Sequence, residues 1–330
     1  MKKLFYGVFV ILVLFSINNF AQEFVCGIQN SNEYRAYNDK GGRFIVSHGE
    51  IKALVIFIQF SDDNDSTNGW PITSPPSLPS WANGMIGEDG NGNYLGLTEY
   101  FDEMSKVNPN NTHGIYKVTG VIYPQVYVPQ HPESYYVSHG KLKEVNEEVL
   151  TNLDPYIDYS QYDNCSATTN NSDGIVDMIY LIYRNFSDSL NSNVALGHWT
   201  GIAGVILNND LFFDGVTIKH SNGWFMQHGS GVTMRGGKYG YTYTKYVVAH
   251  EYGHYLFGAD HIHYTGDLSL MTDGVWNGSR GMHAVEKERL DWLDYQDKTT
   301  DDVIYISDYM TTNDVYRIPL YDNSNNLKEY

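Results

Sequence analysis

The stretch that decides the fold is KYVVAHEYGHYLFGADH, residues Lys245–His261, which contains the pattern His-Glu-x-x-His at His250, Glu251 and His254. Residues four apart in an α-helix lie one turn apart on the same face. His250 and His254 can therefore direct two imidazoles at one point, as a tetrahedral zinc ion requires. Glu251 lies beside the first ligand, where its carboxylate can reach a zinc-bound water without binding the metal itself. The spacing predicts a helical zinc site with a general base.

The residues after this motif predict how the helix ends and how the metal site is completed. Gly258 can adopt positive φ and so end the helix, which apolar residues on both sides of the motif should bury. The turn that follows can bring His261 back to the metal as a third ligand, since imidazole binds zinc well. Asp260 is the alternative third ligand, and His263 or a more distant carboxylate is a further option.

The composition of the chain limits the classes of molecule that we expect it to bind. At 330 residues the chain can bury a sizeable core, as one large domain or two smaller ones. Its formal net charge of −18 argues against nucleic acid or an anionic membrane surface as the main partner. The excess of Asp and Asn suits calcium binding, and it suits solubility outside the cell equally well.

The N-terminus has the layout of a secretory signal peptide. Lys2 and Lys3 precede an apolar run over residues 4–17, and the small residue Ala21 follows. We expect cleavage close to Ala21 or Gln22, and a secreted, extracellular protein. The run is short for a membrane-spanning helix, so we expect no stable membrane insertion after cleavage, with an uncleaved anchor as the alternative.

The two cysteines of the chain, Cys26 and Cys165, leave two options open. In an oxidising compartment they could form a disulfide. Cys26 lies shortly after the predicted cleavage site, so it could instead cap the zinc ion in a latent form.

Hydrophobic patterns predict a chain that mixes strands and helices. The apolar, β-branched runs at residues 51–60 and 175–183 indicate strands buried on both faces. Residues 98–105 indicate a short helix and residues 141–153 an amphipathic one. We further expect a strand pair or meander at 115–128, short strands at 204–207 and 211–218, a helix at 283–293, and strands at 303–307 and 315–320.

A methionine follows the zinc motif at a suggestive distance. Ser269, Leu270 and Met271 lie shortly after His261. A methionine in a tight turn below a zinc site gives the histidine ligands an apolar floor. The alternative for Met271 is ordinary packing, and its position after the His-Glu-x-x-His motif favours the floor.

These motifs together resemble the immune inhibitor A-like family of secreted zinc metallopeptidases, which is related to the metzincins. The resemblance rests on the extended zinc motif, the Ser-x-Met turn and the helix MHAVEKERLDWL at residues 282–293. It continues upstream in ALVIFIQFSD, in LTEYFDEMS followed by YKVTGVIY, and in DYSQYDN followed by SDGIVDMIYLIY. It covers roughly residues 50–295, and its motifs are specific in combination rather than singly.

The chain departs from the family pattern at one point. Metzincins place a glycine seven residues and a third ligand ten residues after the first histidine. Here Gly258 and His261 each come one residue later, as if Phe257 were inserted, and Asp260 takes the unshifted tenth place. The interval from Gly258 to His261 is preserved, which favours His261 over Asp260.

The resemblance implies an α+β fold. We expect a zincin-type catalytic domain with a mixed β-sheet and an HExxH active-site helix, and C-terminal strands that begin a further β region. The predicted organisation is a signal peptide at 1–22, an N-terminal segment in the position of a pro-region at 23–48, a zinc metallopeptidase domain at 49–298, and the start of the C-terminal β region at 299–330. The early stop after the last strand is typical of a fragment of a longer protein.

A loop before the second buried strand predicts a calcium site. Asp163, Asn171, Asp173 and Asp177 alternate with small residues and glycine. Hard oxygen donors on a tight loop are the ligands that calcium selects. A solvated acidic turn is the alternative, because the spacing does not match an EF-hand.

The expected activity is that of a zinc-dependent endopeptidase acting on proteins or peptides, with Glu251 as the general base. An extended substrate could lie along a sheet edge above the helix. Tyr264 and His283 are candidates for stabilising the oxyanion. The alternative function is a secreted binding or adhesion protein with a structural or inactive zinc site, and a zinc hydrolase of non-peptide bonds is a third option.

Overall fold

A computed structural model of the protein describes most of the central part of the chain. The described residues are 23–24, 40–87, 95–107, 111–191, 199–221, 227–259, 261, 269–272, 274–275, 281–293, 296–298, 305, 315–317, 320–321 and 327–329.

A five-stranded mixed sheet forms the centre of the molecule, in the order β3-β2-β4-β8-β5. Its strands are β2 (Gly49–Ile58), β3 (Tyr116–Ile122), β4 (Met178–Tyr183), β5 (Gly201–Ile202) and β8 (Gly231–Met234). β3, β2, β4 and β8 run parallel to one another, whereas β5 pairs antiparallel with β8 at one edge. The chain is therefore mixed α and β with a mixed sheet, as the sequence predicts.

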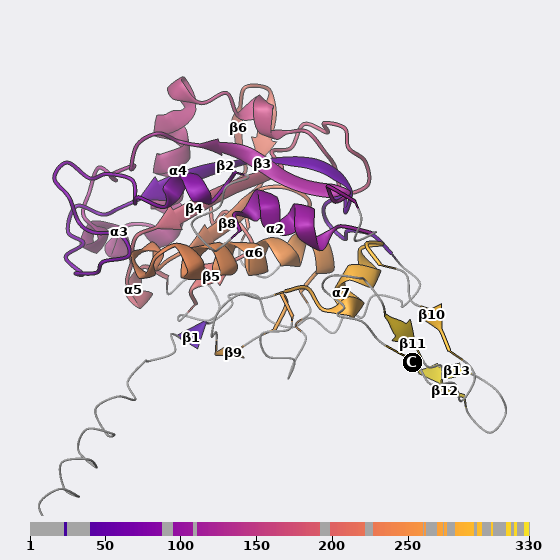
Figure 1. The fold of residues 1–330 in the computed structure, drawn as a ribbon. Helices are drawn as coiled ribbons and strands as arrows, with labels where there is room; N and C mark the ends of the chain where they lie inside the picture. The colour runs from indigo at the N-terminus through magenta and orange to yellow at the C-terminus, as the bar shows by residue number, and fades with distance from the viewer. Residues whose placement is uncertain are drawn as a thin grey trace, which may run out of the picture.

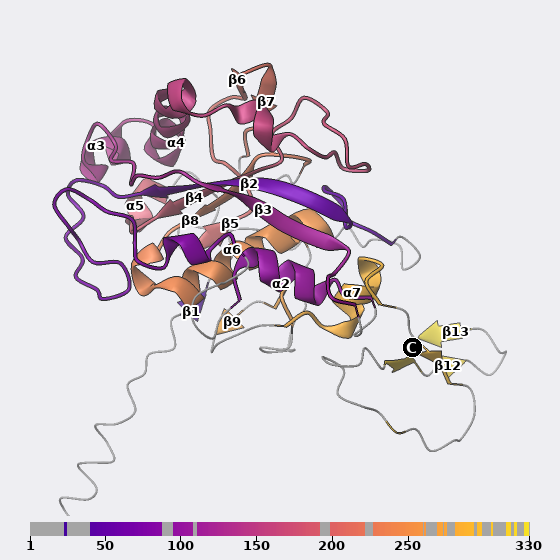
Figure 2. The ribbon, with the colours of Figure 1, turned by 45° about the horizontal axis from the view of Figure 1, so that its top comes forward.

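Helices cover both faces of this sheet (Figure 1 and Figure 2). α6 (Tyr241–Phe257) and α2 (Leu97–Met104) lie on one face. α3 (Glu133–Ser138) and α4 (Lys141–Leu153) lie on the other face, and α5 (Asp188–Asn191) contacts both of them. Because helices lie on both faces, the central strands must be apolar along their whole length. Residues 53–58 of β2 and all of β4 are buried, which confirms the two strands predicted as internal.

The remaining elements are short. They are β1 (Glu23–Phe24) paired with β9 (Gly274–Val275), the hairpin of β6 (Leu211–Phe213) and β7 (Val216–Ile218), α7 (Ala284–Arg289), β10 (Gln296–Asp297) paired with β11 (Tyr316–Arg317), β12 (Leu320–Tyr321) paired with β13 (Leu327–Glu329), and 3-10 turns at Ala82–Gly84, Asp154–Tyr156, Tyr159–Tyr162 and Gly237–Tyr239. Within the described residues, no helix combines the length and apolarity that crossing a bilayer requires.

Two tyrosines anchor α6 to the sheet. The hydroxyl of Tyr252 hydrogen bonds to that of Tyr116 on β3. The Tyr255 hydroxyl accepts a hydrogen bond from the backbone N–H of Gly231 on β8, at 3.1 Å, and donates one to the carbonyl of the same residue. Two residues along a helix correspond to a rotation of about 200°, so side chains at 250 and 254 face away from the sheet when 252 faces it. The anchoring of α6 thus decides where the histidines point.

Residues 40–48 pack against the last turn of α6. The backbone N–H groups of Arg43 and Phe44 donate hydrogen bonds to the carbonyls of Leu256 and Tyr255, at 3.0 Å and 2.9 Å. The indole N–H of Trp292 donates to the carbonyl of Ser47 at 2.6 Å. This part of the predicted N-terminal segment is therefore joined by hydrogen bonds to the helix that carries the zinc motif.

Three sequence predictions for individual elements are wrong. The strand pair expected at 115–128 is the single strand β3, which ends at Ile122 two residues before Pro124 and pairs in parallel with β2. Residues 204–207 form no strand, and within them Ile206 makes a single isolated β-bridge to Ser221. The helix expected at 283–293 is shorter, Ala284–Arg289. The sequence also failed to indicate β8, whose four residues begin with a glycine.

A buried lysine on α6 generates a test of the packing. Lys245 is 1 % exposed, and its Nζ lies 4.0 Å from the ring centroid of Tyr246. Burial lowers the pKa of Lys245 from 10.5 to about 8, although Glu99 acts in the opposite direction. The folded state therefore holds this proton less tightly than the unfolded state does, so stability rises as the pH passes from about 8 towards 10.5 and is lower below about 8.

We predict that Lys245→Met stabilises the protein at pH 7, by up to about 3 kcal/mol less the cation–π contact it removes. The advantage over the parent should shrink as the pH rises from 8 to 10. Chemical denaturation of both proteins across this pH range measures it, with the exposed Lys52→Met as the matched control. An advantage that is independent of pH would contradict the assignment of the cost to a buried charge.

Candidate metal centre

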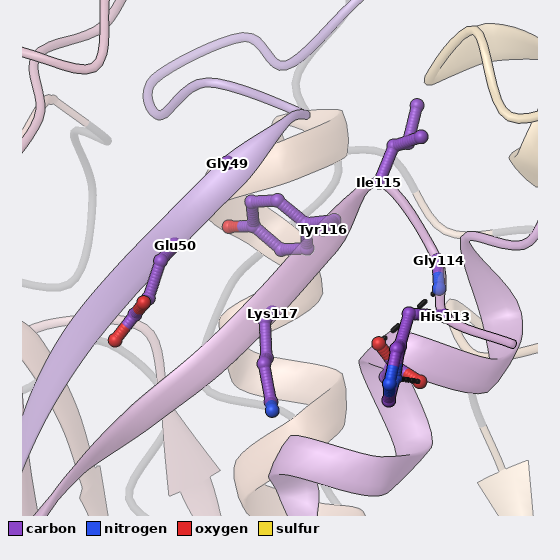
Figure 3. A pocket seen from close by; sticks show the side chains of 8 residues that line it. Gly49, Glu50, His113, Gly114, Ile115, Tyr116 and Lys117 are labelled. Carbon is purple, nitrogen blue, oxygen red and sulfur yellow. Dashed lines mark hydrogen bonds and ion pairs between the residues drawn. The ribbon is translucent and has the colours of Figure 1, made fainter.

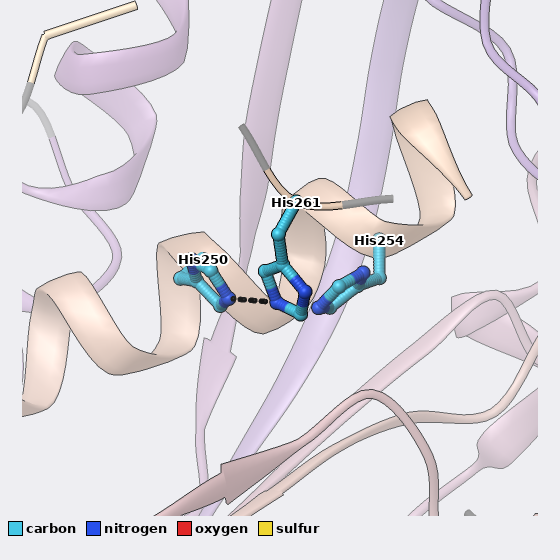
Figure 4. Close-up of side chains that lie close together, drawn as sticks. All are labelled: His250, His254 and His261. Carbon is cyan, nitrogen blue, oxygen red and sulfur yellow. Dashed lines mark hydrogen bonds between the residues drawn. The ribbon is translucent and has the colours of Figure 1, made fainter. Parts of the chain in front are cut away.

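Three histidines converge on one point below α6 (Figure 4). His250 and His254 come from the helix, and His261 comes from the segment that follows it. One ring nitrogen from each lies within 4.8 Å of the others, and the Nε2 atoms of His250 and His261 are 3.3 Å apart. Two nitrogens bound to one tetrahedral zinc ion at 2.0–2.1 Å are separated by roughly 3.3 Å. The three imidazoles therefore fit zinc in chemistry, and the separation of His250 and His261 fits it in spacing.

Backbone carbonyls fix the rings of the two helix histidines. Nδ1 of His250 lies 2.7 Å from the carbonyl oxygen of Leu270, and Nδ1 of His254 lies 2.7 Å from that of Gly258. A carbonyl only accepts, so each Nδ1 carries the hydrogen and each Nε2 presents a lone pair. Burial, and then the neighbouring His261, lower the pKa of His254 to about 3. His254 is therefore in the neutral form that binds a metal.

Gly258 ends α6 as the sequence predicts. Its φ is 90°, in the region that favours glycine, and its N–H donates to the carbonyl of His254 at 2.9 Å. Its own carbonyl accepts from the His254 ring, so the same residue stops the helix and orients this imidazole. The reversal brings His261 back towards His250. Asp260 and His263, the alternatives for the third ligand, lie outside the described residues.

Glu251 lies beside the three histidines and is fully buried. Its Oε2 is 4.0 Å from Nε2 of His254. A Cβ atom on Gly201 of the edge strand β5 would lie 2.7 Å from both Cγ and Oε1 of Glu251, so only a glycine leaves room for this carboxylate. Gly201 is a site residue that the sequence did not reveal, because its importance depends on a contact between distant segments.

Met271 packs directly under the helix between the two histidines. It is 1 % exposed, and its Sδ would lie 2.3 Å from a Cβ atom placed on Gly253. The methionine thus occupies the space that the missing side chain at 253 leaves. Its role as an apolar floor for metal ligands stays a prediction.

A second buried carboxylate, Glu286 on α7, holds the turn that carries Met271. Its oxygens accept hydrogen bonds from Ser269 Oγ at 2.7 Å, Met271 N at 2.8 Å, Leu270 N at 3.2 Å and His283 N at 2.6 Å. Burial raises the pKa of Glu286, and these hydrogen bonds oppose the rise. The Leu270 carbonyl fixed in this way is the acceptor for the ring of His250. Glu286 therefore positions the ring of His250 through the turn.

Sequence reasoning overlooked Glu286, although a local signal was present. His283 and Glu286 form a capping box at the start of α7, in which the His283 ring accepts from the N–H of Val285. The proposed oxyanion role of His283 stays a prediction, and its Nδ1 is already used for this cap. Tyr264, the other candidate, lies outside the described residues.

The predicted calcium loop brings three of its four residues together. Asp163 accepts hydrogen bonds from the backbone N–H groups of Asp173 and Gly174, both at 2.9 Å, and so closes the loop on itself. Asp177 is fully buried at the end of the loop, whereas Asn171 is exposed. Calcium binding here stays a prediction.

The Cys165 thiol is buried and forms no disulfide within the described residues, and its predicted partner Cys26 lies outside them.

A separate surface hollow of about 460 Å³ lies where β2 and β3 begin (Figure 3). Asp102 of α2 accepts from the backbone N–H of Gly114 at 3.2 Å and lies 3.4 Å from the His113 ring. The lining also includes Glu50 and Lys117, so the hollow carries charges of both signs. The described lining residues do not include the three converging histidines.

A scan of the chain against protein-family models found no matching family, and a search of curated proteins found no match. The resemblance drawn from the sequence therefore rests on its motifs.

The packing of Met271 on Gly253 yields a prediction. Gly253→Ala should favour an isolated helix by about 1 kcal/mol. In the protein the new Cβ meets Met271 Sδ and, at 3.3 Å, Leu270 Cδ2, so we expect a net loss of about 1–3 kcal/mol and weaker zinc binding. Thermal denaturation and zinc titration measure the two effects.

The double variant Gly253→Ala, Met271→Ala separates this clash from other causes. If the clash carries the cost, removing the Met271 side chain makes the alanine at 253 much less harmful, and the two substitutions are not additive. Additive costs would show that the glycine is needed for another reason.

Proposed function

We propose that the chain is a zinc-dependent endopeptidase with a zincin-type catalytic domain, similar to the immune inhibitor A-like family. One observation carries the proposal: the Nε2 atoms of His250 and His261 lie 3.3 Å apart in a group that includes His254, while backbone carbonyls hold the Nδ1 atoms of the two helix histidines. Secretion, which the N-terminal sequence predicts, is part of the same proposal.

The three histidines would hold the ion and leave a fourth position for water or substrate. Bound zinc supplies Lewis acidity, which lowers the pKa of a water and polarises a carbonyl group. Glu251, 4.0 Å from Nε2 of His254, takes the proton of the attacking water and then delivers it to the nitrogen of the leaving amine. The buried position of Glu251 limits its own hydration, which strengthens its interaction with the reacting atoms.

The edge strand β5 supports a peptide as the substrate. It is the last strand of the sheet on the side of β8, and its Gly201 lies against Glu251. Both residues of β5 are buried, so an extended peptide would have to reach this edge from the side of the three histidines to gain main-chain hydrogen bonds.

Glu251→Gln tests the proposed mechanism. The amide cannot accept the proton, so kcat/KM on casein should fall by about 10²–10⁴-fold while zinc content stays at the level of the parent. Proteolysis assays with and without chelator, together with elemental analysis, give the two readouts.

His254→Ala is the matched comparison, because it should lose zinc and activity together. Chelator-sensitive proteolysis that survives Glu251→Gln would refute the role of this residue. Stoichiometric zinc without proteolysis in the parent protein would favour a secreted binding or adhesion protein with an inactive site.

Glu286→Gln tests positioning through the turn. The carboxylate accepts from four donors, and an amide nitrogen in its place would face N–H groups, so the turn at 269–271 should shift. We expect zinc affinity to fall about 10–100-fold, as for other residues that orient metal ligands. Competition with a chromophoric chelator measures the affinity directly.

Glu288→Gln, on the same short helix, is the matched control. Glu288 is also largely buried, but its carboxylate pairs with Lys40 at 3.6 Å rather than with the turn. The zinc affinity of the Glu288→Gln variant should equal that of the parent protein. Equal losses in both variants would show that α7 acts only through general stability.

A further inference from the structure

A second group of metal-ligating side chains lies where β4 and β8 begin. Asp177 immediately precedes β4, and His228 lies three residues before β8. Neighbouring parallel strands start at the same edge of a sheet, and here Ile179 pairs with Gly231, so the two side chains meet. The loop that leads into β4 adds Cys165 and Asp173 to the same place.

The donor atoms of this group face one another. Cys165 Sγ lies 3.0 Å from Asp177 Oδ1. His228 Nε2 lies 3.3 Å from the same Oδ1 and 3.4 Å from Asp173 Oδ2. The ligand atoms of Cys165, Asp177 and His228 all lie within 4.8 Å of one another. These separations are close to the edges of a small coordination tetrahedron.

The second polar atom of three of these ligands is held by the backbone. Asp177 Oδ2 accepts from the N–H groups of Asn164 and Cys165, at 2.6 Å and 3.0 Å. Asp173 Oδ1 accepts from the N–H of Ile175 at 3.1 Å. The Nδ1–H of His228 donates to the carbonyl of Phe44 at 2.8 Å. One atom of each side chain is thus oriented, and the other is directed at the centre.

The orientation of His228 points to a cation. Its side chain is 10 % exposed, and its buried Nε2 faces the carboxylate oxygens of Asp177 and Asp173, at 3.3 Å and 3.4 Å. Because Nδ1 holds the hydrogen, a neutral ring turns the lone pair of Nε2 towards two carboxylate oxygens. Positive charge removes this repulsion, either as a proton on Nε2 or as a cation bound between the ligand atoms.

We propose that Cys165, Asp173, Asp177 and His228 form a second metal site, which binds zinc or a similar borderline transition-metal ion. A thiolate and an imidazole favour such an ion over calcium, which prefers oxygen ligands alone. Binding exchanges the Cys165 proton for the metal, so one proton is released to solvent. Asp163 stays outside the ligand set, because its two oxygens close the loop.

The site would be structural. It joins the loop before β4 to the start of β8, and through Phe44 it reaches the segment that packs on the end of α6. It is independent of the proposed peptidase function, because none of its ligands belongs to the three-histidine centre.

Cobalt(II) substitution tests the proposal on the full-length chain. A sulfur ligand gives cobalt a near-ultraviolet charge-transfer band, and the three-histidine centre contains no sulfur. We expect the band in the parent protein, its loss in Cys165→Ser, and its retention in Cys26→Ser. Absence of the band from the parent, or its survival in Cys165→Ser, would overturn the proposal.

Zinc content gives a second readout. In the background His250→Ala, His254→Ala we expect one equivalent of zinc per chain, falling to background on addition of His228→Gln. Glutamine keeps an N–H for the Phe44 carbonyl, and circular dichroism checks that the variant folds. No bound zinc in the first background, unchanged zinc after His228→Gln, or retention of calcium instead would contradict the second site without bearing on catalysis.

Discussion

The hydrogen bonds from ring Nδ1 atoms to backbone carbonyls are the constraint on which the candidate centre depends. An imidazole on a helix can rotate about two side-chain torsions, so the spacing of His250 and His254 brings their rings close without orienting them. The carbonyls of Leu270 and Gly258 supply the orientation, because each accepts the only hydrogen of a neutral ring. Each acceptor is in turn held by its own segment, one by Glu286 and the other by the glycine turn that ends the helix.

The helical repeat of α6 places its sheet-contacting tyrosines and its paired histidines on opposite sides of the helix. Tyr252 and Tyr255 hydrogen bond to strands of the sheet, which places His250 and His254 on the opposite side of the helix. The helix can therefore be buried on every side and still present ligands to one point. A polar helix face exposed to solvent would hold the same residues far less rigidly, since surface side chains keep their rotamer freedom. Burial of α6 thus restricts the rotamers of these side chains as well as contributing to stability.

The sequence alone was sufficient to predict those features whose determinants are neighbouring residues. The spacing of the two histidines, the glycine after the helix and the apolar run of β2 each depend on a few neighbouring residues, and the structure agrees with all three. It was insufficient where the determinants are long-range. Gly201 matters because Glu251 packs on it, and Glu286 matters because a turn fifteen residues earlier lies against it. The strand β8 has a weak pattern of its own and is stabilised by its neighbours β4 and β5.

A histidine bonded through Nδ1 to a carbonyl is not by itself evidence of a metal site. Nδ1 of His139 lies 2.8 Å from the carbonyl oxygen of Tyr135, but the residue is at the surface and stacks on the ring of that tyrosine. Burial together with converging donors distinguishes His250, His254 and His228, and both groups of residues in the described chain that could hold a metal ion contain such a ring. In each group a ring nitrogen that could have bonded to water is turned instead towards other ligand atoms. Neutral rings in this arrangement bring lone pairs together, and a bound cation or an added ring proton offsets the repulsion.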